Sequence, residues 1–257
     1  MTKKRESVFI RSLLVMYSLW TSFWFISSFL LLYPLMLIFL QKITWRRYAH
    51  RLVRLWGQIF FFCAGMRIQV KYHYKPDRKK VYVFCANHFS YLDIPLMVVL
   101  IKNYFSFIGK YEIKKVPLFG YLYARLNILV NRKDRMSRAT SLGRSIKALQ
   151  SQRSIIIFPE GGIVSDQFPF MGKPLMDGAF VMAVQQQVPV VPISFFNNHH
   201  LLNDRTFLLR PGVIKVEIHP PVETTGLSNE DVPVLRDKVF DMIQNPILAY
   251  YGTDAPQ

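Results

Sequence analysis

Short apolar runs alternate with longer segments of helical periodicity over most of the chain. The last helical segment is predicted to begin at Ser228, which forms a capping box with Asp231, and to run towards Gln244. Strands that alternate with helices in this way are typical of an α/β domain. The apolar runs are 81–86, 106–108, 128–130, 155–158, 188–196 and 213–218, and the clearest helical segments are 137–150 and 174–187.

A long uncharged segment precedes this domain. No charged residue lies between positions 11 and 42, and residues 13–40 are almost all apolar. A continuous helix over the uncharged interval reaches about 45 Å, against about 30 Å for the hydrocarbon core of a bilayer. The segment is therefore predicted to cross a membrane with tilt, or to bend near Pro34 or at Ser27 and Ser28 and re-enter. Basic residues flank both sides, which favours a hairpin with both ends on the cytoplasmic face.

Residues 52–70 follow with apolar positions at near-helical spacing and basic positions elsewhere on the helical wheel. This pattern predicts an amphipathic helix, either at the membrane interface or packed against the following domain. We therefore divide the chain into membrane-embedded and interfacial helices over 1–70 and the α/β domain over 71–257.

The composition indicates anionic partners. The chain has 33 Lys and Arg against 16 Asp and Glu, a formal net charge of +17, and 51% hydrophobic residues. Nucleic acid is the first alternative, but the sequence contains no nucleic-acid-binding motif, and the apolar excess is unlike a basic arm. Anionic membrane lipid together with a phosphorylated substrate explains both properties.

A histidine and an aspartate lie where the apolar run 81–86 gives way to a helix. His88 stands five residues before Asp93. An imidazole can take the proton of a hydroxyl that attacks an acyl carbonyl, and a nearby carboxylate fixes its tautomer. The alternative is structural, because Ser90 and Asp93 also form a capping-box pattern at a helix start. Pro95 places that start near Asp93 itself.

The sequence N-H-F-S-Y-L-D at 87–93 resembles the N-H-x-x-x-x-D motif of the 1-acylglycerol-3-phosphate acyltransferase family. Three further blocks resemble those of the family and follow in its order. They are I-L-V-N-R at 128–132, F-P-E-G at 158–161 and V-P-V-V-P at 188–192.

The resemblance implies a single glycerolipid-acyltransferase-like α/β domain, with a mixed sheet flanked by helices and preceded by a membrane helix or helical hairpin. It implies transfer of a fatty acyl group from acyl-CoA or acyl carrier protein to 1-acylglycerol 3-phosphate, without a cofactor. His88 is then the general base and Asp93 orients it. The expected location is a bacterial inner membrane, with the active site on the cytoplasmic face.

Two alternatives stay open at this point. One keeps the chemistry and takes another lyso-lipid or glycerol 3-phosphate as acceptor. The other is a non-catalytic basic lipid-binding membrane protein, against which His88 and Asp93 argue, because binding alone needs no general base.

The other motif residues are predicted to bind substrate. Arg132 would grip the acceptor phosphate, Glu160 would orient the acceptor or a basic ligand, and Gly161 and Gly162 would offer N–H groups to an anion. The alternatives are a solvated charge for Arg132 and a plain turn for the glycines. The family often has an arginine where this chain has Ile163. Lys173, in the following loop, is the predicted replacement for that charge.

No metal site is predicted. Cys63 and Cys85 have no paired spacing, and Cys85 lies in an apolar run where a thiolate would be suppressed. His199, His200 and His219 belong to no sequence motif with the spacing of metal ligands.

Overall fold

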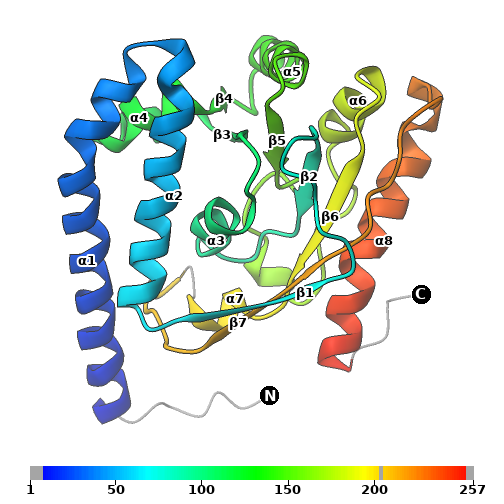
Figure 1. Ribbon diagram of the computed structural model, residues 1–257. Helices are drawn as coiled ribbons and strands as arrows, with labels where there is room; N and C mark the ends of the chain where they lie inside the picture. The colour runs from blue at the N-terminus through cyan, green and yellow to red at the C-terminus, as the bar shows by residue number, and fades with distance from the viewer. Residues whose placement is uncertain (1–7, 203–204, 253–257) are drawn as a thin grey trace.

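Seven strands form one sheet in the order β1-β7-β6-β2-β5-β3-β4 in the computed structural model, which describes residues 8–202 and 205–252 (Figure 1). Neighbouring strands are parallel except β6 and β7, so β1 and β7 run opposite to the other five. The predicted mixed sheet is thereby confirmed. The strands are β1 (Arg67–Tyr72), β2 (Val83–Ala86), β3 (Phe105–Lys110), β4 (Ile128–Val130), β5 (Ser154–Ile157), β6 (Val190–Phe195) and β7 (Val213–Ile218).

Eight α-helices occur in the described residues. They are α1 (Val8–Leu40), α2 (Arg46–Cys63), α3 (Asp93–Leu100), α4 (Phe119–Leu126), α5 (Arg135–Gln150), α6 (Gly178–Gln185), α7 (Asn198–Leu201) and α8 (Val232–Tyr251). Short 3-10 helices cover Ile43–Trp45, Tyr111–Lys115, Ser165–Gln167 and Asn229–Asp231. The capping box predicted at Ser228 and Asp231 is present, and it starts the last of these 3-10 turns, which leads into α8. That helix continues beyond Gln244, where the sequence pattern placed its end.

Alternate residues of the central strand β2 face two different layers of helices. Phe84 packs in a cluster with residues of α2 and α3, whereas Val83 and Cys85 pack with residues of α5, α6 and α8. All four residues of β2 are buried. A strand covered on both faces needs apolar side chains on both, which explains why 81–86 reads as a continuous apolar run.

The helix predicted over residues 52–70 is wrong in its C-terminal part. Helix α2 ends at Cys63, and β1 begins at Arg67. The turn between them is closed by hydrogen bonds from Gly65 N to Phe62 O and from Met66 N to Phe61 O, with Gly65 at a φ of +62°. Glycine adopts this left-handed conformation without steric cost and therefore ends the helix. Strand β1 crosses residue 70, where the sequence placed the domain boundary.

Helix α1 is continuous from Val8 to Leu40 and contains Pro34, so the bend that the sequence allowed inside it does not occur. The hairpin in this structure is instead formed by α1 and α2, which lie side by side (Figure 1). Their contact is aromatic: Trp56 of α2 lies 4.4 Å from Phe25 and 4.9 Å from Phe29, measured between ring centroids.

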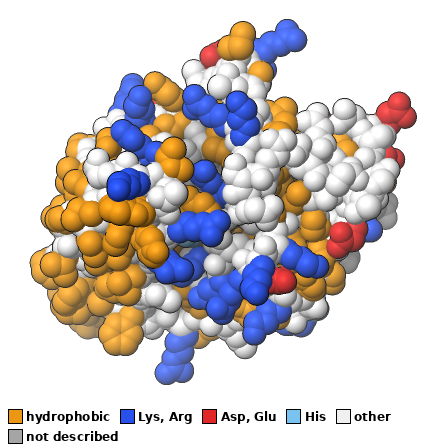
Figure 2. Space-filling view, turned by 45° about the horizontal axis from the view of Figure 1, so that its top comes forward, with side chains coloured by type: hydrophobic (Ala, Val, Ile, Leu, Met, Phe, Trp, Pro, Cys, Tyr) orange, Lys and Arg blue, Asp and Glu red, His pale blue; other side chains and the backbone are white. Residues whose placement is uncertain are grey.

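The outer surface of α1 is apolar. The helix is long and apolar enough to cross a membrane by length and composition, and it is the only such helix in the described residues. Large side chains project from it into solvent, with Leu31 81% exposed and Phe23 59% exposed. In Figure 2, hydrophobic side chains gather on the left side of the molecule, where α1 and α2 lie in Figure 1. Apolar area of this extent on a soluble surface indicates contact with a membrane or a partner.

Candidate active site

The site lies at the C-terminal end of β2, in the loop that leads to α3. Asn87 anchors this loop to the neighbouring strand, because its Nδ2 donates to Phe195 O at 2.9 Å and its Oδ1 accepts from Phe195 N at 2.8 Å. Asn87 is fully buried, and both hydrogen-bonding groups of its amide are used. The next residue, His88, is therefore held at a fixed position above the carboxyl edge of the parallel strands, where open α/β sheets bind their ligands.

His88 and Asp93 are hydrogen-bonded. Nδ1 of His88 lies 2.9 Å from Oδ2 of Asp93, and Asp93 is fully buried. The same Oδ2 accepts from the backbone N–H groups of Phe89 and Ser90, each at 3.0 Å, and Oδ1 accepts from Asn198 Nδ2 at 2.6 Å. A buried carboxylate surrounded by donors is a pure acceptor, so it holds the His88 tautomer with the proton on Nδ1.

The capping box proposed for Ser90 and Asp93 is only half formed. Asp93 accepts from Ser90 N, but Ser90 Oγ accepts from Leu92 N and donates to Leu202 O instead of bonding to Asp93 N. Helix α3 begins at Asp93, with Pro95 in its first turn as predicted. Asp93 thus both fixes the loop and contacts His88.

The other ring nitrogen of His88 is free to act on a substrate. Within residues 8–202 and 205–252, no hydrogen-bond partner occurs for Nε2, and the side chain is 10% exposed. The ring stacks on Phe158 at 4.1 Å between centroids, with 16° between the ring planes. Because Nδ1 carries the proton, Nε2 presents its lone pair, as a general base requires.

Glu160 is adjacent to His88 but contacts its backbone. Oε1 of Glu160 accepts from His88 N at 2.6 Å, and Oε2 accepts from Gly172 N at 3.0 Å. Burial raises the pKa of Glu160 to about 8, although both N–H donors favour the charged form. Both carboxylate oxygens of Glu160 are therefore used by backbone N–H groups, and its predicted role in orienting the acceptor or a basic ligand stays a prediction. Glu160 therefore positions the His88 loop.

Arg132 lies in a groove that reaches the His88 site. The groove is lined by Arg132, Phe158 and Gly161, and Phe158 is the residue that stacks on His88. Partial burial lowers the pKa of the Arg132 guanidinium. Nearby Tyr123 and Glu112 raise this pKa and so oppose the effect of burial. A guanidinium remains charged under any such shift, so the groove carries a fixed positive charge beside an apolar wall.

The two glycines differ from each other in this groove. Gly161 has a φ of +83°, a conformation that strains any residue with a side chain, and a Cβ there would also displace the flexible end of Met176, whose Cε would lie 2.4 Å away. The N–H of Gly161 donates to Phe158 O at 3.1 Å within a turn, and its predicted role in binding an anion stays a prediction. A Cβ at Gly162 would lie 3.9 Å from Arg132 Nη1, so Gly162 leaves room beside the guanidinium.

Lys173 is exposed, and its ammonium lies 4.0 Å from the centroid of the Phe240 ring in α8. This cation–π contact directs the side chain towards α8. Its predicted role as a substitute for the arginine missing at Ile163 stays a prediction, which requires the side chain to leave Phe240.

Residues 67–196 match the family model described as Acyltransferase. The chain belongs to the acyltransferase family. The matched segment contains both His88 and Asp93, together with Arg132, Glu160 and the glycine pair.

Several curated relatives of this acyltransferase carry the name 1-acyl-sn-glycerol-3-phosphate acyltransferase. The mouse alpha form is 30% identical over 69% of this chain and 62% of its own length, and the Saccharomyces cerevisiae protein is 27% identical over 64% and 55%. The chain thus spans less than two thirds of the length of these relatives. The structure of the 1-acyl-sn-glycerophosphate acyltransferase PlsC from Thermotoga maritima superimposes with a TM-score of 0.71, covering 94% of this chain and 98% of that one. At 21% sequence identity, this likeness shows the fold.

An apolar cavity of the acyltransferase lies between the N-terminal hairpin and the sheet. It is lined by Phe25 of α1, Trp56 of α2, Phe107 of β3 and Tyr123 of α4. Phe107 stacks at 6.4 Å on Phe158, whose other neighbour is His88. Phe107 in the cavity wall is therefore stacked on Phe158 in the groove wall, and Phe158 in turn is stacked on His88.

Sequence reasoning missed Asn198, which donates to Asp93 from 105 positions later in the chain. Its only signal was a cluster of asparagines at 197, 198 and 203 in a polar loop. Cys85 was expected to pack in its strand with its thiolate form suppressed. Its side chain is fully buried, and burial raises the pKa of the thiol, as expected.

Proposed function

We propose that this acyltransferase moves a fatty acyl group from an acyl thioester to the free hydroxyl of 1-acylglycerol 3-phosphate, forming phosphatidic acid. The observation that carries the proposal is the buried pair of His88 and Asp93, in which Nδ1 is held by the carboxylate while Nε2 is free. Such a pair is suited to remove a proton from a hydroxyl, and a lipid hydroxyl that acts as nucleophile needs no acyl-enzyme.

The proposed reaction is a single transfer through a tetrahedral intermediate. Nε2 of His88 takes the proton of the acceptor hydroxyl while its oxygen forms a bond to the thioester carbonyl carbon. Collapse of the intermediate breaks the carbon–sulfur bond, and the imidazolium returns the proton to the thiolate that leaves. Asp93 stabilises the imidazolium throughout, because its carboxylate lies 2.9 Å from Nδ1.

The cavity lined by Phe107 and the groove lined by Phe158 support a division of the substrates. The apolar cavity behind Phe107 suits a hydrocarbon chain, and the groove that contains Arg132 suits the acceptor phosphate. The names of the curated relatives support 1-acylglycerol 3-phosphate as the acceptor. Acyl-CoA and acyl carrier protein are both donors within this proposal.

The proposal includes the membrane. The apolar surface of α1 and the net charge of +17 support binding to a bilayer that contains anionic lipid. We place the protein at a bacterial inner membrane with the active site on the cytoplasmic face, where acyl thioesters are made.

A transfer assay with purified full-length protein in detergent tests the proposal. Labelled acyl-CoA and labelled acyl carrier protein are each offered with lysophosphatidic acid, phosphate-free lyso-lipids and glycerol 3-phosphate. We expect the label to appear in phosphatidic acid, and His88→Ala to abolish it. Transfer only to another acceptor would show that 1-acylglycerol 3-phosphate is not the substrate. Absence of transfer to every acceptor would overturn the proposal.

A further inference from the structure

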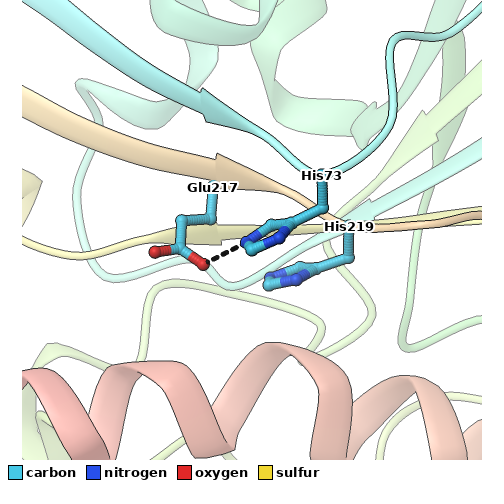
Figure 3. A group of neighbouring side chains, drawn as sticks. All are labelled: His73, Glu217 and His219. Carbon is cyan, nitrogen blue, oxygen red and sulfur yellow. Dashed lines mark hydrogen bonds and ion pairs between the residues drawn. The ribbon is translucent and has the colours of Figure 1, made fainter.

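Three potential metal ligands lie together at the edge of the sheet formed by β1 and β7. His73, Glu217 and His219 each offer one ligand atom, and these atoms lie within 4.8 Å of one another (Figure 3). His73 Nε2 lies 2.8 Å from Glu217 Oε2, and the rings of His73 and His219 are stacked with 12° between their planes.

The register of the sheet explains why these residues meet. Strands β1 and β7 are parallel, and Lys71 pairs with Glu217 and Tyr72 with Ile218. His73 follows in the same register, since its N–H donates to Ile218 O at 3.0 Å. Side chains two positions apart in a strand point to the same face, so Glu217 and His219 face the same side as His73. The backbone therefore holds the three side chains in place without a local sequence motif.

A hydrogen bond to Ser194 fixes the tautomer of His219. Ser194 Oγ donates to Ile243 O at 2.9 Å, so its remaining capacity is to accept from His219 Nε2, which lies 2.8 Å away. The proton of the neutral ring is then on Nε2, and Nδ1 carries the lone pair. A hydrogen bond that fixes the tautomer in this way is typical of histidines that bind metals.

We propose that His73, Glu217 and His219 bind one divalent transition-metal ion, with Zn²⁺ as the best fit. Two imidazoles and one carboxylate form a donor set that zinc uses, with water as the fourth ligand. Ligands in a tetrahedral zinc site lie about 3.3 Å apart, given metal–ligand distances of about 2.0–2.1 Å. The cluster must therefore contract by about 1.5 Å at its widest. Rotation of His73, whose side chain is 36% exposed, supplies this movement.

The site is open to solvent on one side. A surface depression lined by His219 and by Lys238 and Asp241 of α8 leads to it. Lys71 already forms an ion pair with Glu217 Oε1 at 3.1 Å, but its side chain is 65% exposed. An exposed pair of this kind contributes little, so the ammonium competes only weakly with a divalent ion for the carboxylate.

The metal would act on the structure and not on the acyl transfer. The cluster lies at the C-terminal ends of β1 and β7, which run opposite to β2, so these ends point away from the edge where His88 lies. Strand β1 is an edge strand that pairs only with β7 among the described residues, and it joins the α1 and α2 hairpin to the sheet. A metal ion that bridges β1 and β7 would therefore stabilise the attachment of the α1 and α2 hairpin to the sheet.

Calorimetric titration of the full-length, metal-free protein in detergent with Zn²⁺ tests the proposal. We expect one equivalent to bind, and His73→Ala and Glu217→Gln each to weaken binding at least tenfold. Glu223→Gln, which removes an exposed acid just beyond β7, is the matched control and should bind as the wild type does. Co²⁺ bound in place of Zn²⁺ should give the visible absorption of a tetrahedral site, and His73→Ala should lose it.

Thermal unfolding provides the second readout. Zn²⁺ should raise the melting temperature of the wild type but not that of His73→Ala, because a ligand stabilises only the state that binds it. His73→Ala is preferred to a change at His219, whose hydrogen bond to Ser194 also supports the fold. Absence of binding to the wild type, or binding that His73→Ala and Glu217→Gln leave unchanged, would overturn the proposal.

Discussion

Nδ1 of His88 lies 2.9 Å from Oδ2 of Asp93, and the same carboxylate oxygen accepts the backbone N–H groups of Phe89 and Ser90. One carboxylate therefore both fixes the loop and orients the His88 ring. This double use explains why the acid stands only five residues after the histidine, at the first residue of α3.

Replacement of His88 tests the base. We expect His88→Ala to lower kcat by at least about a hundredfold, the usual contribution of a general base, with little change in thermal unfolding. His200→Ala, at an exposed histidine with no assigned role, is the control for loss of an imidazole. Turnover within a few fold of wild type in folded His88→Ala would contradict the mechanism.

Asn198 is a positioning residue, because it acts through Asp93. Asn198→Ala leaves Asp93 Oδ1 without its donor, at a cost of about 1–3 kcal/mol, and should lower kcat more than it raises KM. Asn198→Asp should be worse and should shift the pH profile of kcat, because two carboxylates in contact resist joint ionisation. The exposed Asn245→Ala is the control for asparagine loss. An unchanged pH profile in Asn198→Asp would show a merely structural role.

Arg132 is predicted to bind the phosphate of the acceptor. Arg132→Ala should raise the KM for lysophosphatidic acid at least about tenfold while the KM for the acyl donor changes little. Arg132→Lys should recover only part of the loss, because an ammonium lacks the planar two-pronged geometry of a guanidinium. Lys133→Ala, an exposed neighbour, is the control for general loss of charge. If Arg132→Ala raised the KM values of both substrates equally, Arg132 would not be the residue that binds the acceptor phosphate.

The raised pKa of Glu160 predicts a pH dependence of stability. Burial raises this pKa from 4.5 to about 8, so the folded state binds the proton more tightly than the unfolded state. The resulting stabilisation is complete below about pH 4.5 and is lost as the pH rises towards 8. Glu160→Gln should flatten this part of the profile when unfolding midpoints are measured across that range. A profile that keeps the wild-type slope would assign the dependence to another group.

The exposed face of α1 is predicted to hold the protein on the membrane. The double variant Phe23→Lys with Leu31→Lys should release protein from vesicles, because both side chains project into solvent and neither forms the contact with Trp56. Phe23→Ala with Leu31→Ala is the control for loss of side-chain volume. Sedimentation with vesicles measures the binding, and full retention of the lysine variant would exclude this face as the anchor.

Features that depend on neighbouring residues in the chain were predictable from the sequence. The apolar runs located six of the seven strands, most clearly β2, which is apolar throughout because helices cover both of its faces. The pairing of His88 with Asp93 was also predictable, since the strand end and the start of α3 bring them together over a few residues. The missed strand, Arg67–Tyr72, alternates polar and apolar positions after Gly65, and that local signal was present in the sequence.

Contacts between residues far apart in the chain were not predictable, because they depend on how the strands pair. Asn198 reaches Asp93 because the loop after β6 lies beside the loop after β2, and His73 meets His219 because β1 pairs in parallel with β7. Glu160 likewise supports the backbone of His88, although its motif predicted a role in binding substrate. Hydrophobic periodicity specifies which face of a strand is buried, but it does not specify the partner strand, so contacts across the sheet depend on how the whole chain packs.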